Sequence, residues 1–429
     1  MEILISLAIA LFAGLMLSRV AKLLGLPAVT AYLVAGILIG PFCLGRLGVK
    51  GLGFSNGLLE DMGIISDVAL GFIAFAIGNE FRLSQLKTIG KQATIIGIFQ
   101  AVFTTIIVDV ALITLHFIIP DKFPLSAAII MGAIASATAP AATLMVVRQY
   151  KAKGPVTDVL LPVVALDDAV GLVLFSISFG IARGLEQHVS ILAIILEPII
   201  EVVLSVGLGA IMGYVFTYFE RFFHSRSKRL AMSVAFVFLT VGISMIEFNI
   251  GEVVFRFSPL LACMMLGTIF CNICDFSEQL MDRLDRWTAP IFILFFVISG
   301  AELDLNVLTD LIIVLIGVVY ILFRCLGKYF GASFSAKLAK SEPNIVKYLG
   351  ITLFPQAGVA LGMAITVGNA MGGGIGMIVA NLTLFSVLVY ELIGPFLTKV
   401  ALTKAGEIDK EGKVSERKKV ENEQMKNAQ

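Results

Sequence analysis

Long apolar segments, separated by short polar connections, run along almost the whole chain. A helix needs about 20 mostly apolar residues to cross the hydrocarbon core of a bilayer. We count about thirteen such segments, at 3–23, 27–43, 62–80, 91–117, 124–149, 157–183, 191–217, 229–247, 256–274, 287–301, 307–333, 347–370 and 374–400. Residues 401–429 are polar and rich in Lys and Glu, so we expect a disordered tail or a short surface helix there. The pattern predicts an all-α integral membrane protein with about thirteen transmembrane helices.

Composition supports this class and argues against others. Of the 429 residues, 58% are hydrophobic and 15% are charged, and a soluble domain could not bury so much apolar surface. Arg19 and Lys22 follow the first apolar segment instead of preceding it, so this segment is expected to be a membrane helix and not a secretory signal. The pair Cys271 and Cys274 has no second pair to complete a zinc site. We expect no cofactor and no nucleic-acid partner.

Lys and Arg are distributed unevenly between alternate connections. One set of connections carries most of them, and the other set carries only Arg46, Lys50, Lys122, Arg183 and Arg256. Connections rich in Lys and Arg stay on the cytoplasmic side of a membrane. The N-terminus is therefore predicted outside and the C-terminal tail in the cytoplasm, which agrees with an odd number of spans.

Thirteen spans divide into two six-helix repeats, at about 3–183 and 229–400, with a linker helix at about 191–217. Each repeat has an even number of spans, so a single linker helix between them places the two repeats in opposite orientations, as in many secondary transporters. The fifth segment of each repeat is interrupted, at 132–143 around Pro140 and at 352–362 around Pro355 and Gly358. Proline removes a backbone hydrogen bond and frees carbonyl groups. We expect two crossed, broken helices at a midplane binding site, with a pair of ordinary kinked helices as the alternative.

Two adjacent acids, Asp167 and Asp168, lie near the centre of the sixth apolar segment. One charge at that depth costs about 2.5–3.5 kcal/mol on insertion scales. Two neighbouring carboxylates in a low-dielectric environment do not both ionise readily, so each could hold a proton or a cation. Competition between the two ions for one carboxylate is the physical basis of cation/proton exchange. The alternative is a structural pair that is hydrogen-bonded internally.

Arg324, in the eleventh segment, is the expected counter-charge, because an arginine inside a membrane normally pairs with an acid. We expect it to pair with Asp167 and to leave Asp168 as the cation ligand. Lys328, one turn later, is expected to extend toward the cytoplasm. Thr138, with Ser136, could supply the oxygen ligands that Na+ prefers, or could simply pack between helices. The expected Na+ site therefore consists of Asp168, Asp167 and Thr138.

Several other acids lie within or at the ends of apolar segments, namely Asp67, Glu80, Asp109, Glu197, Glu201 and Glu391. We expect structural pairing or a place at the lipid interface for most of them. The roles of Glu80, Asp109 and Glu391 are left open.

These motifs, taken in order, resemble the bacterial cation:proton antiporter-2 branch of the sodium/hydrogen exchangers, over about residues 3–400. The resemblance rests on Leu26-Pro27, 35–41, Gly78-Asn79-Glu80, Thr138-Ala139-Pro140, Asp167-Asp168, the Arg-x-x-Gly of 324–327 and 355–362. It implies a core domain with crossed broken helices, a separate dimerisation domain and a homodimer in the bacterial plasma (inner) membrane. It also implies an elevator-like cycle in which Asp168 binds the cation and Asp167 is paired.

The resemblance leaves the number of transported protons open. The double aspartate is similar to that of electrogenic members, which commonly carry lysine where this chain has Arg324. Lysine can lose its proton when buried, whereas arginine effectively cannot. A second aspartate is unfavourable to keep at mid-membrane merely as a structural element, which favours electrogenic exchange.

The expected function is that of a secondary antiporter, not an enzyme, with Na+ (or Li+ or K+) and H+ as substrates and membrane lipids around it. A K+/H+ antiporter or K+ efflux protein of the same fold is the alternative. An intramembrane aspartyl protease is disfavoured, because its two aspartates lie on different helices, typically with a G-x-G-D motif. A non-transporting sensor is disfavoured because the tail carries no signalling domain.

Overall fold

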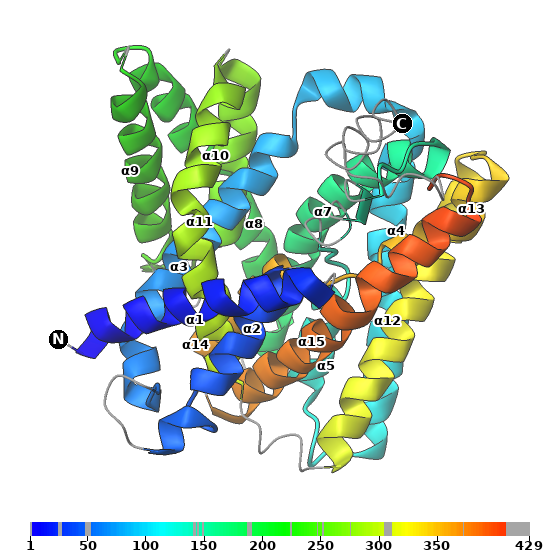
Figure 1. Cartoon of the computed structure of the whole chain (residues 1–429), viewed down its shortest axis with the longest axis horizontal. Coiled ribbons are helices and arrows are strands. Elements are labelled where there is room, and N and C mark those ends of the chain that lie inside the picture. Colours follow the sequence, from blue (N-terminus) through cyan, green and yellow to red (C-terminus); the bar gives the residue numbers. More distant parts are fainter. Residues whose placement is uncertain are drawn as a thin grey trace, which may run out of the picture.

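The computed structural model describes residues 2–24, 28–47, 53–139, 143, 146–147, 150–186, 191–223, 225–246, 248–250, 253–274, 276–303, 311–371 and 373–408. Helices form nearly all of this part of the chain (Figure 1). They are α1 (Glu2–Leu24), α2 (Ala28–Ile39), α3 (Asn56–Glu80), α4 (Leu83–Ile118), α5 (Leu125–Ile134), α7 (Pro155–Glu186), α8 (Ile191–Glu220), α9 (Arg226–Ser244), α10 (Pro259–Ile273), α11 (Ser277–Ala301), α12 (Leu311–Leu338), α13 (Pro343–Thr352), α14 (Gly358–Met371) and α15 (Gly373–Lys404). A short 3-10 turn, η1 (Leu44–Leu47), and a hairpin of β1 (Phe248–Ile250) and β2 (Val253–Phe255) complete it.

The predicted all-α membrane fold is confirmed. Within the described residues, nine helices are long and apolar enough to cross a membrane, and four further apolar helices are shorter. The total of thirteen spans stays a prediction. The largest difference at a helix end concerns α11, which begins at Ser277 and not near 287. Its first turns are amphipathic, with Leu280 and Leu284 buried between charged residues, so hydropathy marks the apolar part of this helix and misses its start.

Both predicted helix breaks are present. α5 ends at Ile134, and the chain is not helical over 135–139. In the second half, α13 ends at Thr352 and α14 begins at Gly358, so Pro355 lies in the non-helical segment between them. Pro140, expected at the first crossover, lies outside the described residues. Each break leaves backbone carbonyl groups without helical partners, and these must be satisfied inside the protein.

The helices form two groups that stand side by side (Figure 1). In one group, α3 packs on α10, and α10 packs on α8. In the other group, α4 packs on α12 and α7, and α13 and α14 pack on α15. Gly78 of α3 and Gly267 of α10 allow a close approach in the first group, because a Cβ on either would lie within 2.2 Å of a backbone oxygen of the other helix. The domain limits expected from the two repeats stay a prediction.

Candidate functional site

Asp167 and Asp168 lie near the middle of α7, and their exposed fractions are 0% and 1%. α7 is helical through both residues, so their side chains leave the helix about 100° apart and meet different neighbours. Asp167 accepts hydrogen bonds from the side chains of Gln100 on α4 and Thr138 in the first break. Asp168 accepts a hydrogen bond of 3.3 Å from the backbone N–H of Thr138. The first break therefore contacts both carboxylates.

Lys328 on α12 forms the ion pair with Asp167. Its Nζ lies 2.5 Å from Asp167 Oδ2, and both side chains are fully buried. The same ammonium group donates to the hydroxyl of Thr138 at 2.9 Å and to the carbonyl of Ser136. The expectation that Lys328 extends toward the cytoplasm is therefore wrong, because the pair and the carbonyl hold the ammonium inside the protein.

Arg324, the predicted partner of Asp167, instead donates to backbone carbonyl groups of the two breaks. Its Nε and Nη2 lie 2.9 and 2.6 Å from the carbonyl oxygens of Ala135 and Ala137, and its Nη1 lies 2.7 Å from that of Phe354. The guanidinium also lies over the ring of Tyr390 on α15, at 4.4 Å from the ring centroid. The predicted pairing is thus corrected: Lys328 neutralises Asp167, and Arg324 joins the two breaks.

The two breaks also contact each other directly. The N–H of Ala139 donates to the carbonyl of Pro355 at 2.9 Å, and the side-chain amide of Gln356 donates to the carbonyl of Ile134 at the same distance. The carbonyl groups of residues 134–137 all accept from side-chain donors on other elements. Cationic donors at the carboxyl end of a helix are favoured by its dipole. The carbonyl groups freed at the first break therefore bind protein donors in this conformation.

The residues predicted to bind the cation do lie together. Thr138 contacts both carboxylates, through its hydroxyl and through its backbone N–H. Ser136 takes part through its carbonyl, while its hydroxyl donates to the carbonyl of Ala133 at 2.7 Å. Gly358 begins α14 directly after the second break. Among the described residues, no three His, Cys, Asp or Glu side chains gather as a metal cluster, so a cation at Asp168 would need hydroxyl, backbone or water oxygens as further ligands.

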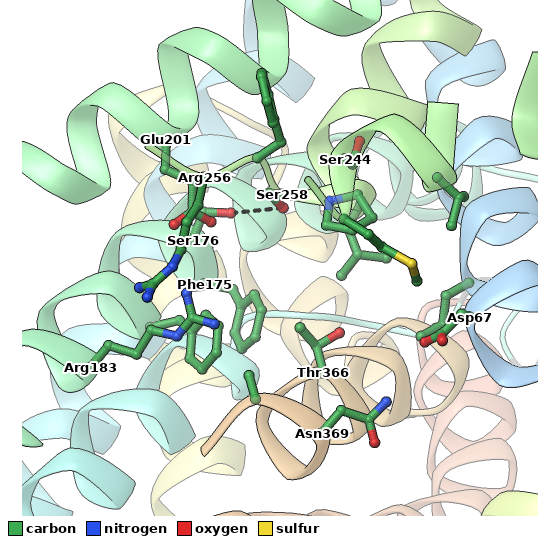
Figure 2. Close-up of a pocket in the computed structure, with 18 residues that line it drawn as sticks. Asp67, Phe175, Ser176, Arg183, Glu201, Ser244, Arg256, Ser258, Thr366 and Asn369 are labelled. Atoms are coloured by element: carbon green, nitrogen blue, oxygen red, sulfur yellow. Dashed lines mark hydrogen bonds between the residues drawn. The ribbon is translucent and has the colours of Figure 1, made fainter. Parts of the chain in front are cut away.

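A cavity of about 420 Å³ opens between the two groups of helices, near the C-terminal end of α7 (Figure 2). Figure 2 shows Asp67 of α3 on one side of it and Arg183 of α7 on the other, with Asn369 of α14 between them. Among its lining residues on α7, Phe175 is the nearest to Asp168 in sequence, about 10 Å away along the helix. The cavity therefore approaches the carboxylates but ends before them.

Leu70 of α3 and Gly362 of α14 are in close contact beside this cavity. Leu70 lines the cavity, and a Cβ added to Gly362 would lie 2.3 Å from Leu70 Cδ2. The contact joins one helix of each group. A relative movement of the two groups must change it.

The remaining acids are dispersed. Asp67 and Glu201 line the cavity, whereas Asp109 packs against Gly132 of α5. Glu391 is buried on α15, with an exposed fraction of 1%. The side chains of Glu80 and Glu197 lie outside the described residues.

Three uncharged residues of the site were missed by sequence analysis, namely Gln100, Gln356 and Tyr390. Each carries polar atoms within an apolar segment or a break, which was the available signal. They carry no charge, so they were not singled out. The structure shows that they bind Asp167, a freed carbonyl and Arg324, respectively.

Comparisons with known proteins identify a matching family and a similar fold. The model of the transmembrane sodium/hydrogen exchanger family matches residues 7–404. The fold is similar to that of the sodium proton antiporter MjNhaP1 from Methanocaldococcus jannaschii at pH 8, with a TM-score of 0.73 and 19% identity over 94% of this chain and 100% of that one. A 3D EM map of the same antiporter gives a TM-score of 0.67 and 18% identity, over 94% and 97% of the chains.

A shorter match links the chain to a plant protein. Over 79 residues it is 33% identical to K(+) efflux antiporter 5 of Arabidopsis thaliana. This match covers 18% of this chain and 12% of that protein.

Proposed function

Because the chain belongs to the sodium/hydrogen exchanger family, we propose that it is a secondary antiporter that exchanges a monovalent cation, with Na+ the expected one, for protons. The observation that carries this proposal is the buried pair of Asp167 and Lys328 beside Asp168, at the contact of two broken helices. Ionisable groups inside a membrane domain are energetically unfavourable, and those that occur there usually serve a function. Here they gather at one place.

Asp168 is the proposed binding residue for the cation or the proton. Asp167 is held by Lys328, Gln100 and Thr138, and Asp168 accepts a hydrogen bond from the backbone N–H of Thr138. A cation that reaches Asp168 would displace its proton, because one carboxylate does not hold both. Asp167, one residue away on α7, adds negative charge to the site, and Thr138 is the proposed hydroxyl ligand.

Lys328 is the proposed source of the second proton. When Asp167, Asp168, Lys328 and Arg324 are all ionised, their charges cancel. A bound cation adds one positive charge, and the loss of a proton from Lys328 removes it. A buried lysine can lose its proton in this way, whereas Arg324 stays charged.

The exchange that follows is electrogenic, with one cation moved against two protons carried by Asp168 and Lys328. Arg324 does not prevent this stoichiometry, because the structure gives it a different role from the one expected from sequence. Its task in the proposal is to keep the two breaks together.

The proposed access route is the cavity between the two groups of helices. The group with α4, α5, α7 and α12–α15 would slide as one body against the group with α1–α3 and α8–α11, which exposes Asp168 to each side in turn. The proposed membrane orientation has the N-terminus outside and the C-terminus in the cytoplasm. The proposed assembly is a homodimer in a bacterial plasma membrane, which the family resemblance supports.

Exchange by the purified protein in liposomes tests the proposal. A preset pH gradient should dissipate when Na+ or Li+ is added, and the Asp168→Asn variant should leave it intact. Potassium is the third cation to add, because the similarity to a K(+) efflux antiporter supports K+ as the alternative substrate. A wild-type protein that responds to none of the three cations would contradict the antiporter proposal.

A further inference from the structure

The chain turns back onto the helix bundle directly after α15. α15 ends at Lys404, and Gly406 adopts a left-handed conformation with φ of 78°. The N–H of Gly406 donates to the carbonyl of Thr403, and the N–H of Glu407 donates to that of Leu402. This pair of bonds is the glycine-dependent helix end that reverses the direction of a chain. It directs Glu407 toward the beginning of α7.

Glu407 binds the first turn of α7 with both carboxylate oxygens. Oε1 accepts from the N–H of Val156 at 2.6 Å, and Oε2 accepts from the N–H and the hydroxyl of Thr157 at 2.8 and 2.7 Å. The N–H of Lys153 donates to the carbonyl of Glu407 at 3.0 Å. The Glu407 residue is 6% exposed. Glu407 therefore accepts hydrogen bonds from four donors, which an exposed side chain in a loose surface contact would not do.

α7 lacks a capping side chain of its own. The residue before its first residue, Pro155, is Gly154, which has no side-chain acceptor, and Asp158 in the first turn is exposed. The first N–H groups of a helix need an acceptor, and a negative charge there is favoured by the helix dipole. The carboxylate of Glu407 supplies the acceptor and the negative charge, although Glu407 lies about 250 residues away in sequence.

The same segment also contacts α13. The side-chain amide of Asn344 donates to the carbonyl of Ala405 at 3.4 Å. Leu402 is fully buried in a cluster with Leu160 of α7 and Leu349 of α13. α7 carries the two aspartates, and α13 ends at the second break, so residues 402–407 join the two elements that place the site.

We propose that Glu407 is a positioning residue for exchange, which fixes the start of α7 against α13 and α15. α7 is helical from Pro155 to Glu186, with Pro162 inside it. The position of its first turn therefore affects the depth of Asp167 and Asp168 against Lys328. Thr157 precedes Asp167 by ten residues, or about 15 Å of helix. The inference rests on the exchange activity proposed above.

Exchange by the full-length protein in liposomes, measured over a range of Na+ concentrations, tests this role. Glu407→Ala should raise the Na+ concentration for half-maximal rate by about threefold or more, the size expected if a lost helix cap acts on the cation-bound state. Glu407→Gln, which keeps an acceptor, should give a smaller change. Glu342→Ala is the matched control, because Glu342 is exposed at the start of α13 and its side chain makes no capping bond. It should behave as wild type.

A lower melting temperature with an unchanged half-maximal Na+ concentration would show that Glu407 is merely structural and would overturn the inference. If Glu407→Ala does not fold, Glu407→Gln and Thr157→Ala are judged by the same criterion, since Thr157→Ala removes one donor only. Normal exchange by the wild type together with wild-type values for these variants would overturn this inference alone. A wild type without exchange would overturn the proposed function and this inference together.

Discussion

Lys328 Nζ lies 2.5 Å from Asp167 Oδ2, inside a part of the protein where both side chains are fully shielded from solvent. Arg324, one turn earlier on α12, is equally buried but binds carbonyl groups of the two breaks. One cation of α12 therefore neutralises an acid and the other satisfies the broken backbone. This division of roles makes different predictions for the two residues.

Substitution of Lys328 by arginine should change the proton count. Arginine keeps the positive charge but does not release a proton at accessible pH. We expect slower exchange whose rate and final gradient no longer depend on an imposed membrane potential, whereas wild-type exchange should depend on it. The measurement is Na+-driven proton flux in liposomes with the potential set by valinomycin and potassium.

Lys337→Arg is the matched control, since Lys337 is exposed on the same helix. Wild-type exchange that is indifferent to the potential would mean one proton per cation, and the electrogenic proposal would then be wrong.

The two aspartates should respond differently to amidation. Asp168→Asn should abolish cation-coupled proton movement and leave the ion pair in place. Asp167→Asn should leave Lys328 buried without its partner, and removing one member of a buried pair lowers stability by about 3–5 kcal/mol. Thermal unfolding in detergent, measured beside exchange, separates the two effects. Complete loss of exchange in both variants at unchanged melting temperature would refute this division of roles.

Arg324→Ala should destabilise the contact between the breaks. The carbonyl groups of Ala135, Ala137 and Phe354 would each lose a charged donor, and buried groups left unsatisfied cost about 1–3 kcal/mol each. We expect a clear drop in melting temperature, of which Arg324→Lys recovers only part, because one ammonium group does not reproduce the planar fork. A melting temperature equal to that of wild type for Arg324→Ala would show that the breaks do not need the arginine.

The contact of Leu70 with Gly362 should respond to side-chain size. Gly362→Ala places a methyl group 2.3 Å from Leu70 Cδ2, so the Leu70 side chain must move, and exchange should slow. Leu70→Ala in the same protein should restore space and recover much of the rate. Exchange rates of the two single variants and the double variant give the coupling between the sites. Strictly additive effects would argue against this contact as part of the moving interface.

The membrane orientation can be tested with a reporter fused after Gln429. The uneven distribution of Lys and Arg predicts that the reporter behaves as a cytoplasmic protein. A reporter fused before Met1 should behave as an external one. A C-terminal reporter outside the cytoplasm would contradict the predicted orientation and the predicted number of spans. The inverted-repeat argument, which depends on that number, would then be wrong as well.

Several features of this protein follow from local stretches of its sequence. The apolar segments predicted a helical membrane protein, because a helix satisfies all its backbone hydrogen bonds within the segment that crosses the bilayer. The interruptions near 132–143 and 352–362 predicted two broken helices, and both breaks are present. Asp167 and Asp168 were singled out because acids are so unfavourable at that depth, and the structure places them at the contact of the breaks. These inferences depend on local composition, which the chain carries directly.

Which charged side chains meet depends on how the helices pack. The sequence-based expectation paired Arg324 with Asp167 and directed Lys328 toward the cytoplasm. The two residues lie one turn apart on one face of α12, so their spacing alone did not decide which of them meets the acid. The choice depends on how deeply α12 sits beside α4, and on the carbonyl groups that the breaks turn toward Arg324. The cap that Glu407 provides to α7 has no local signal at all, because its partners lie about 250 residues away. Contacts at such separations are fixed by helix packing, and packing is a property of the folded chain.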